Sequence, residues 1–275
     1  MADKIVIQKE TLDRLGANFQ ESRGITDKLT IEQMIEFAKE PVGGNKLAQL
    51  ADGSLTEITA ADLKGITKIA AYAFYYCGNL YTVILPDTIK SIDEHAFERT
   101  NLREITIPNN SVINILANAF TYCTQLTHIT LPEGLIGLGN GIFSNCTKLE
   151  NVSLPNSITY IPNGMFYQCG KLKNVILPNN ITSIGNQAFM YCYALTDMII
   201  PNSVSSIGTT AFAQDSALTT IRIGNGITSI ASNAFNNSTA LTDIYIDKPE
   251  GSVSGAPWGA TNATVHWNTP LPSNS

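Results

Sequence analysis

The chain has 275 residues, of which 44% are apolar, so it can bury a substantial core in one or two domains. Only 15% of the residues are charged, and the net charge of −6 excludes nucleic acid and anionic membrane surfaces as expected partners. The first ten residues lack the apolar core of a signal peptide, and no stretch is apolar for long enough to predict membrane insertion.

The sequence pattern of residues 1–40 predicts a small helical segment. Apolar residues recur there at helical spacing, and Thr30 with Gln33 forms a capping-box pattern that opens a second helix. Pro41 ends this helix, and we interpret the glycine-containing residues 41–54 as a linker. Two helices this short bury little surface alone, so we expect them to pack on each other, on the first coil of the solenoid, or on another chain, which would mediate self-association.

A 23-residue repeat organises the remainder of the chain. An aromatic residue recurs at this interval, as Phe74, Phe97, Phe120, Phe143, Phe166, Phe189, Phe212, Phe235 and Trp258. Such a period predicts a solenoid, in which each repeat is one unit stacked on its neighbours. We place eight copies in residues 55–247, a C-terminal cap in residues 248–267 and a disordered tail in residues 268–275.

Each copy follows one template, which residues 181–201 show clearly. An apolar pair is followed by the aromatic residue, then by a Leu, and then by a short strand. Side chains in the strand alternate between apolar and polar, which predicts one inward and one outward face. A Pro marks the end of six of the strands, where no backbone N–H is needed for pairing with the next strand. The Ala-Phe pair and its flanks predict a short helical or 3₁₀ turn.

Five cysteines lie three residues after a repeat aromatic, and three explanations compete for this column. No Cys-x-x-Cys pair or His partner has the spacing of a metal site. Disulfides are awkward, because neighbouring coils are about 4.8 Å apart with parallel side chains, whereas a bridge needs Cβ atoms about 3.8 Å apart. Small buried apolar fillers fit best. The column contains Cys77, Cys123, Cys146, Cys169 and Cys192, with Thr100, Asp215 and Ser238 in other copies.

The repeat closely resembles that of the BspA-like leucine-rich repeat family. The matching residues are Ile181, Ile184, Gly185, Ala188, Phe189, Cys192, Leu195, Ile200 and Pro201. The resemblance implies an α/β solenoid: a right-handed leucine-rich-repeat superhelix with a parallel β-sheet on one face and short helical or irregular segments on the other. Members of this family are mostly bacterial surface proteins that bind proteins, matrix or host cells, and they are not known as enzymes.

Residues 25–40 are similar to short helical lead-in segments of phage tail or baseplate-like proteins. This second resemblance implies a different function, in which the chain is a structural or receptor-binding component of a phage-like or other large assembly. Residues 1–40 would then attach it. The localisation stays open between the cell surface or extracellular space, a phage particle and the cytoplasm.

We predict that the outward face of the strands binds a protein or glycoprotein. Exposed apolar side chains rimmed by polar ones can mark a contact patch. The candidate partner-binding residues are Asn174, Ile176, Asp197, Ile199, Arg222 and Tyr245. The alternative is that β-branched residues simply suit strands and carry no partner.

The sequence predicts no enzyme, cofactor or metal site. General acid–base catalysis needs paired groups at a fixed separation, but Asp197 and Asp243 should lie two coils apart, about 10 Å, on opposite sides of Thr220. The three histidines, His95, His128 and His266, stand alone in the sequence, and no nucleophile-elbow or phosphate-loop motif is present.

A second aromatic set lies two residues after the repeat Phe, at Tyr76, Tyr122 and Tyr191. These tyrosines could form a strip that contacts sugar or protein on the side opposite the sheet. Alternatively, they are partly buried and cover the turns, with their hydroxyls directed to water. The sequence favours the second explanation.

Overall fold

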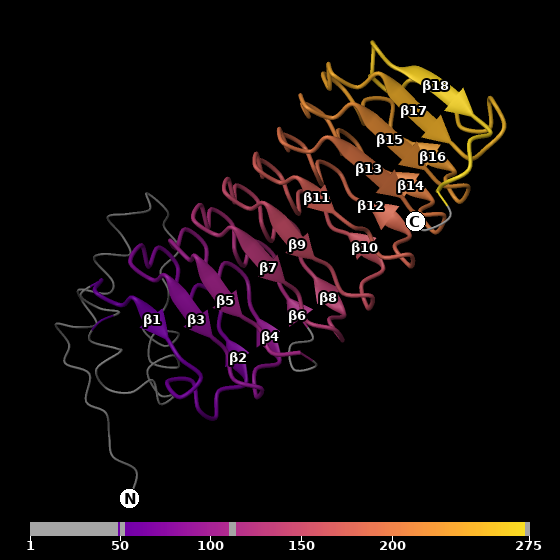
Figure 1. Ribbon diagram of the computed structural model, residues 1–275. Helices are drawn as coiled ribbons and strands as arrows, with labels where there is room; N and C mark the ends of the chain where they lie inside the picture. The colour runs from indigo at the N-terminus through magenta and orange to yellow at the C-terminus, as the bar shows by residue number, and fades with distance from the viewer. Residues whose placement is uncertain (1–48, 50–52, 110–113, 273–275) are drawn as a thin grey trace, which may run out of the picture.

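The computed structural model describes Gln49, residues 53–109 and residues 114–272. They form a parallel β-solenoid of about nine turns, here called coils, with repeats of about 23 residues (Figure 1). The helical segment predicted for residues 1–40, most of the predicted linker and the last three residues of the chain lie outside the described residues. The right-handed sense of the superhelix stays a prediction.

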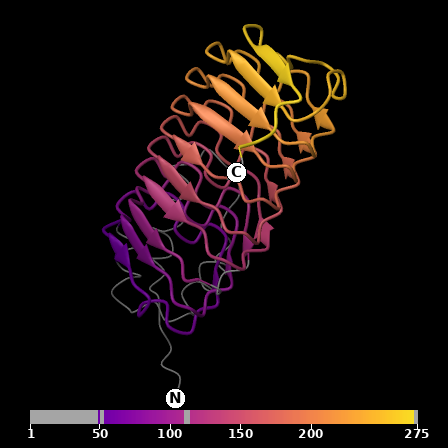
Figure 2. The same cartoon turned by 45° about the vertical axis from the view of Figure 1, so that its right-hand side comes forward.

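One side of the solenoid, the long-strand face, contains the strands that follow the template Leu of each coil, together with the last strand of the chain, which no such Leu precedes. These strands run side by side along the molecule (Figures 1 and 2). They are β1 (Glu57–Ile58), β3 (Thr82–Ile84), β5 (Glu104–Thr106), β7 (His128–Thr130), β9 (Asn151–Ser153), β11 (Asn174–Val175), β13 (Asp197–Ile200), β15 (Thr220–Ile223), β17 (Asp243–Ile246) and β18 (Thr264–Trp267).

A second side, the short-strand face, is built from two-residue strands that the sequence did not predict. Each one contains the second member of the template's apolar pair, whose side chain is buried. They are β2 (Lys68–Ile69), β4 (Ser91–Ile92), β6 (Asn114–Ile115), β8 (Gly137–Leu138), β10 (Tyr160–Ile161), β12 (Ser183–Ile184), β14 (Ser206–Ile207) and β16 (Ser229–Ile230).

All strand pairs are parallel and join equivalent residues of neighbouring coils. On the long-strand face the hydrogen-bonded orders are β1-β3-β5, β11-β9-β7 and β13-β15-β17-β18. On the short-strand face they are β2-β4-β6-β8 and β10-β12-β14-β16. The register follows the repeat, so Asp197 pairs with Thr220 and Thr220 with Asp243. A parallel sheet on one face is therefore confirmed, and the structure adds a second parallel ladder.

The third side, the turn face, connects each short strand to the next long strand. Its segments are residues 72–78, 95–101, 118–124, 141–147, 164–170, 187–193, 210–216 and 233–239, and all of them are turns. The helical or 3₁₀ turn predicted here is wrong, because residues 53–109 and 114–272 contain no helix.

Hydrogen bonding between coils explains why these segments are not helical. In residues 187–193 every second backbone N–H leaves the segment: Gln187, Phe189 and Tyr191 donate to carbonyls of the next coil at 2.9, 2.8 and 3.1 Å. An α-helix would direct those N–H groups to its own carbonyls. Gln187 and Tyr191 also have positive φ, 57° and 67°, which a right-handed helix does not allow.

The repeat aromatics form a continuous ladder through the core, as the sequence predicted. Each of the eight Phe side chains is at most 1% exposed. Neighbouring rings are stacked, with centroid separations from 5.0 Å for Phe189–Phe212 to 5.9 Å for Phe143–Phe166. Burying a Phe contributes about 1.5–3 kcal/mol, so the ladder is a major source of stability.

Trp258 continues the aromatic column at the C-terminal end. Its ring meets Phe235 edge-on at 6.4 Å and Trp267, in the last strand, at 6.3 Å. The Trp258 side chain is fully buried. Across the part of the chain that the structure describes, no helix has the length and hydropathy needed to cross a membrane.

Candidate binding surfaces

The long strands present every second side chain to solvent. In β7 and β9 the middle residue is buried between two exposed neighbours. In β13, Asp197 and Ile199 are exposed whereas Met198 and Ile200 are buried. Because successive residues of a strand point to opposite faces, the outward positions of successive coils form two columns along the long-strand face.

The apolar part of the predicted site lies on two consecutive coils. Ile176, which directly follows β11, is 86% exposed, and Ile199 in β13 is 38% exposed. Asn174 and Asp197, two residues earlier in the respective coils, are exposed as well. The structure therefore places these four residues as an apolar pair with polar neighbours.

Arg222 and Tyr245 belong to a stack of three side chains nearer the C-terminal end. Strand pairing places Arg222 beside Tyr245 and Tyr245 beside His266. The guanidinium carbon of Arg222 lies 4.1 Å from the centroid of the Tyr245 ring, and the His266 ring stacks on Tyr245 at 4.5 Å. Both faces of the Tyr245 ring are thus covered, and Arg222 and Tyr245 are half-buried rather than fully exposed.

His266 does not stand alone as predicted, because its Nε2 lies 2.7 Å from Oδ1 of Asp243. The Thr242 hydroxyl donates to Oδ2 of the same carboxylate at 2.7 Å. These two hydrogen bonds, from Thr242 first and then His266, lower the pKa of Asp243. His95 is also paired, with Glu98. The repeat period could have revealed the first pair, since residue 266 lies one period after residue 243.

A shallow hollow of about 470 Å³ adjoins the predicted patch. It is lined by residues of β7, of β9 and of the coil of β11, and Asn174 and Ile176 are among them. The outward side chains that line it are mainly polar, among them His128, Asn151 and Ser153. The hollow and the isoleucine pair therefore make one continuous surface of mixed polarity.

The cysteine column is a buried structural feature, as predicted. All five thiols are free, and four of them are fully buried. Burial raises the pKa of Cys77 and of Cys123 to about 12, so neither thiolate is present at neutral pH. The thiols also have a role that the sequence did not show: that of Cys146, for example, donates to the carbonyl of Phe120 at 3.1 Å. Within residues 53–109 and 114–272, His, Cys, Asp and Glu side chains form no group of three suited to a metal ion.

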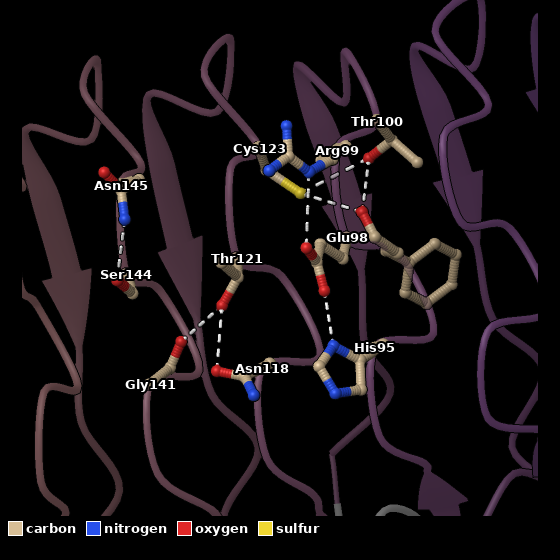
Figure 3. A network of polar contacts seen from close by, with 11 residues as sticks. His95, Glu98, Arg99, Thr100, Asn118, Thr121, Cys123, Gly141, Ser144 and Asn145 are labelled. Carbon is tan, nitrogen blue, oxygen red and sulfur yellow. Dashed lines mark hydrogen bonds and ion pairs between the residues drawn. The ribbon is translucent and has the colours of Figure 1, made fainter. Parts of the chain in front are cut away.

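The turn face carries the second aromatic set, whose side chains are partly buried, as the sequence favoured, with Tyr191 half-buried. Tyr76 is 45% exposed and Tyr122 is 37% exposed. The Arg99 guanidinium lies between their rings, 5.4 Å from Tyr76 and 4.3 Å from Tyr122. Figure 3 shows Arg99 beside Glu98, which in turn contacts His95.

The turn segments are joined by side-chain hydrogen bonds as well as by the backbone. The Thr121 hydroxyl donates to the carbonyl of Gly141 in the next coil at 2.7 Å, and the Cys123 thiol donates to the carbonyl of Phe97 in the preceding coil at 3.2 Å (Figure 3). These bonds join neighbouring turn segments and so fix the backbone positions from which the exposed side chains of the turn face project.

Comparison with known proteins agrees with this architecture. The model of the BspA type leucine-rich repeat region matches residues 50–169 and 138–254, with six copies. No curated protein matches the chain.

Several solved structures are similar. A leucine-rich repeat protein from Bacteroides ovatus is 26% identical with a TM-score of 0.63, and the match covers 78% of this chain and 61% of that protein. One from T. pallidum is 27% identical with a TM-score of 0.49, covering 59% and 68%. A leucine-rich cell surface protein from Faecalibacterium prausnitzii is 24% identical with a TM-score of 0.35, covering 74% and 77%. The chain thus spans less than two thirds of the Bacteroides ovatus protein.

The family match covers most of the chain, and the structure shows the 23-residue coils that this repeat requires. The chain belongs to the family of BspA-type leucine-rich repeat proteins.

Proposed function

We propose that this protein is a non-catalytic adhesion module whose long-strand face binds a protein or glycoprotein. The observation that carries the proposal is the exposure of Ile176, which places 86% of a large apolar side chain in water on an ordered sheet. A patch of this kind, rimmed by polar residues, favours a contact site. Family membership supports binding rather than catalysis, because repeat solenoids commonly bind partners along their extended surfaces.

The Arg222–Tyr245–His266 stack adds a second contact point to this surface. Tyr and Arg are enriched among the residues that dominate the energy of protein interfaces. Here both side chains are already held by stacking, so little conformational entropy is lost when a partner binds. Ile176 and this stack would therefore act as two anchors on the long-strand face.

The test is a binding assay on immobilised fibronectin, laminin and collagen and on intact epithelial cells. Ile176→Asp should weaken binding at least tenfold, as expected for an interface residue worth about 2 kcal/mol. The matched control is Ile136→Asp, because Ile136 is 72% exposed but precedes β8 on the short-strand side. Equal effects of the two substitutions, or none from either, would exclude the long-strand face as the binding surface.

The alternative function, a component of a phage-like or other assembly, depends on residues 1–40. Because those residues lie outside the described part of the chain, the alternative stays a prediction. Removing residues 1–54 and measuring the mass in solution tests it. Loss of an oligomer on truncation would assign the segment to assembly, whereas an unchanged mass would count against self-association.

A further inference from the structure

A second surface, on the turn face, gathers four tyrosines that the proposed adhesion site does not use. The rings of Tyr167 and Tyr191 meet edge-on at 5.6 Å, and those of Tyr191 and Tyr193 at 5.9 Å. Burial, and to a smaller extent the hydroxyls of Tyr191, Tyr122 and Tyr193, raise the pKa of Tyr167. The sequence pattern could not show this cluster, because its members occupy three different positions of the repeat.

The glycine of the preceding coil leaves room for the Tyr193 ring. A Cβ at Gly170 would be 3.2 Å from Cδ2 of Tyr193, so the missing side chain makes room for the ring. Tyr193 nevertheless stays 50% exposed. Tyr122, at the other end of the cluster, has Arg99 against its ring at 4.3 Å and is 37% exposed. Two aromatic platforms therefore remain accessible to solvent.

The turn segments that contain these tyrosines contribute no exposed charged side chain; the Arg99 guanidinium at Tyr122 comes from the preceding coil. The turn segments 118–124, 141–147, 164–170, 187–193, 210–216 and 233–239 contain no Lys, Arg, His or Glu. Their single Asp, Asp215, is fully buried. The long-strand face differs, since it presents Asp197, Arg222, Asp243 and His266. A charged partner would find several complementary groups on the long-strand face and, on this part of the turn face, only Arg99 at the Tyr122 end.

One accessible amide side chain, that of Gln168, lies between the aromatic platforms, because Asn145 is buried and donates to the Ser144 hydroxyl. Asn145 and Gln168 occupy, in the two intervening coils, the position that Tyr122 and Tyr191 occupy in theirs. Within the described part of the chain, the Gln168 side chain makes no hydrogen bond, and only its backbone N–H is used, donating to the carbonyl of Met190 at 2.9 Å. The Gln168 amide is therefore available as both a donor and an acceptor for a ligand.

We propose that the turn face around Tyr122, Gln168, Tyr191 and Tyr193 binds a neutral oligosaccharide. The C–H faces of a pyranose ring pack on exposed aromatic rings, and its hydroxyls pair with amides and phenolic hydroxyls. Three coil spacings separate Tyr122 from Tyr191, about 14 Å at the usual strand spacing, which is long enough for a short oligosaccharide. No charged side chain comes from the turn segments that contain Tyr122, Gln168, Tyr191 and Tyr193, which fits a neutral sugar better than an acidic one.

Isothermal titration of the full chain with maltohexaose, cellohexaose, xylohexaose and mannohexaose tests this proposal. At least one neutral probe should bind, and a heparin oligosaccharide should not. Tyr193→Ala should weaken that binding at least tenfold. The matched control is Tyr160→Ala, because Tyr160 is also 37% exposed, like Tyr122, but lies in β10 on the short-strand face.

Three results would overturn the proposal: no binding of any neutral probe at millimolar concentration, binding of heparin alone, or equal loss of binding in the two tyrosine variants. Loss of a protein partner instead of a sugar in Tyr193→Ala would also contradict it. Ile176→Asp should leave sugar binding unchanged, which separates this site from the proposed adhesion site. Thermal unfolding of each variant confirms that the solenoid remains folded.

Discussion

Asp215 occupies a position in the cysteine column at which a carboxyl group is poorly accommodated. The side chain is fully buried; its Oδ1 accepts the N–H of Cys192 at 2.7 Å, and its Oδ2 has no hydrogen-bond partner. Burial raises the pKa of Asp215 well above its ordinary value. The native state therefore keeps a proton that the unfolded chain releases above a pH of about 3.9. As the pH rises above that value, the free energy of unfolding falls.

We expect Asp215→Ser to stabilise the solenoid at pH 7 by about 1–3 kcal/mol, the usual cost of an unsatisfied buried polar group. Ser suits the column, because Ser238 in the next coil donates to the carbonyl of Phe212 at 2.6 Å. Urea unfolding at pH 7 and at pH 4 measures the free energy of unfolding of both proteins. The difference between the Ser variant and the wild type should be smaller at pH 4. A variant that is no more stable than the wild type at pH 7 would contradict the assignment.

Gln214 shows a backbone constraint that recurs on the turn face. Its φ is +65°, and the equivalent residues Tyr122 and Gln168 have φ of 59° and 60°. Left-handed backbone costs an L-residue about 1–2 kcal/mol, Asn tolerates it better than most residues, and branching at Cβ makes it worse. Gln214 already bears this cost, so Gln214→Val should lower the free energy of unfolding only by the added strain of a branched Cβ, on the order of 1 kcal/mol, whereas Gln214→Asn should leave it equal or slightly higher. Chemical denaturation of the two variants side by side is the measurement, and equal midpoints would contradict this explanation.

At the scale of the elements, the long strands and the aromatic ladder could be predicted because each depends on a pattern within one repeat. Period-two alternation located the inward residues of β13, and the constant spacing of Phe located the ladder. The turn segments and short strands could not be predicted in the same way. Their backbone groups bond to the neighbouring coil, as the Phe189 N–H does to the carbonyl of Ala211. Such bonds cannot be predicted from the local helical propensity of the sequence.

Only those parts of the candidate surfaces that lie at one repeat position could be predicted from the sequence. Ile176 and Ile199 were found because outward positions follow directly from strand alternation. The Tyr167–Tyr191–Tyr193 cluster combines different repeat positions from neighbouring coils, and no single column of the repeat contains it. Side-chain packing between coils, rather than the repeat itself, determines such clusters.

The aromatic ladder should contribute measurably to the free energy of unfolding. Phe143 stacks on Phe120 at 5.7 Å and on Phe166 at 5.9 Å, and it is fully buried. Phe143→Ala should lower the free energy of unfolding by about 3–5 kcal/mol, through lost burial and the cavity left behind. Phe143→Leu, which keeps more of the volume, should cost less. Equilibrium unfolding in guanidinium chloride measures both, and a loss below about 1 kcal/mol for Ala would show that the ladder does not support the core.

For the whole molecule, the solenoid separates two surfaces of different character. The long-strand face offers an exposed isoleucine pair and a charged stack, whereas the later coils of the turn face offer tyrosines and amides without charge. Because each coil contacts only its neighbours, a substitution on one surface should leave distant coils intact. The two binding proposals can therefore be tested independently on one protein.

We propose that the long-strand face, and not another side of the solenoid, docks the protein partner. The decisive measurement is photo-cross-linking, with a benzophenone amino acid in place of Ile176 or, as the control, of Ile136, and with whichever immobilised matrix protein binds in the panel. We predict a covalent adduct from position 176 and none from position 136. An adduct from position 136 alone, while binding persists, would contradict the account.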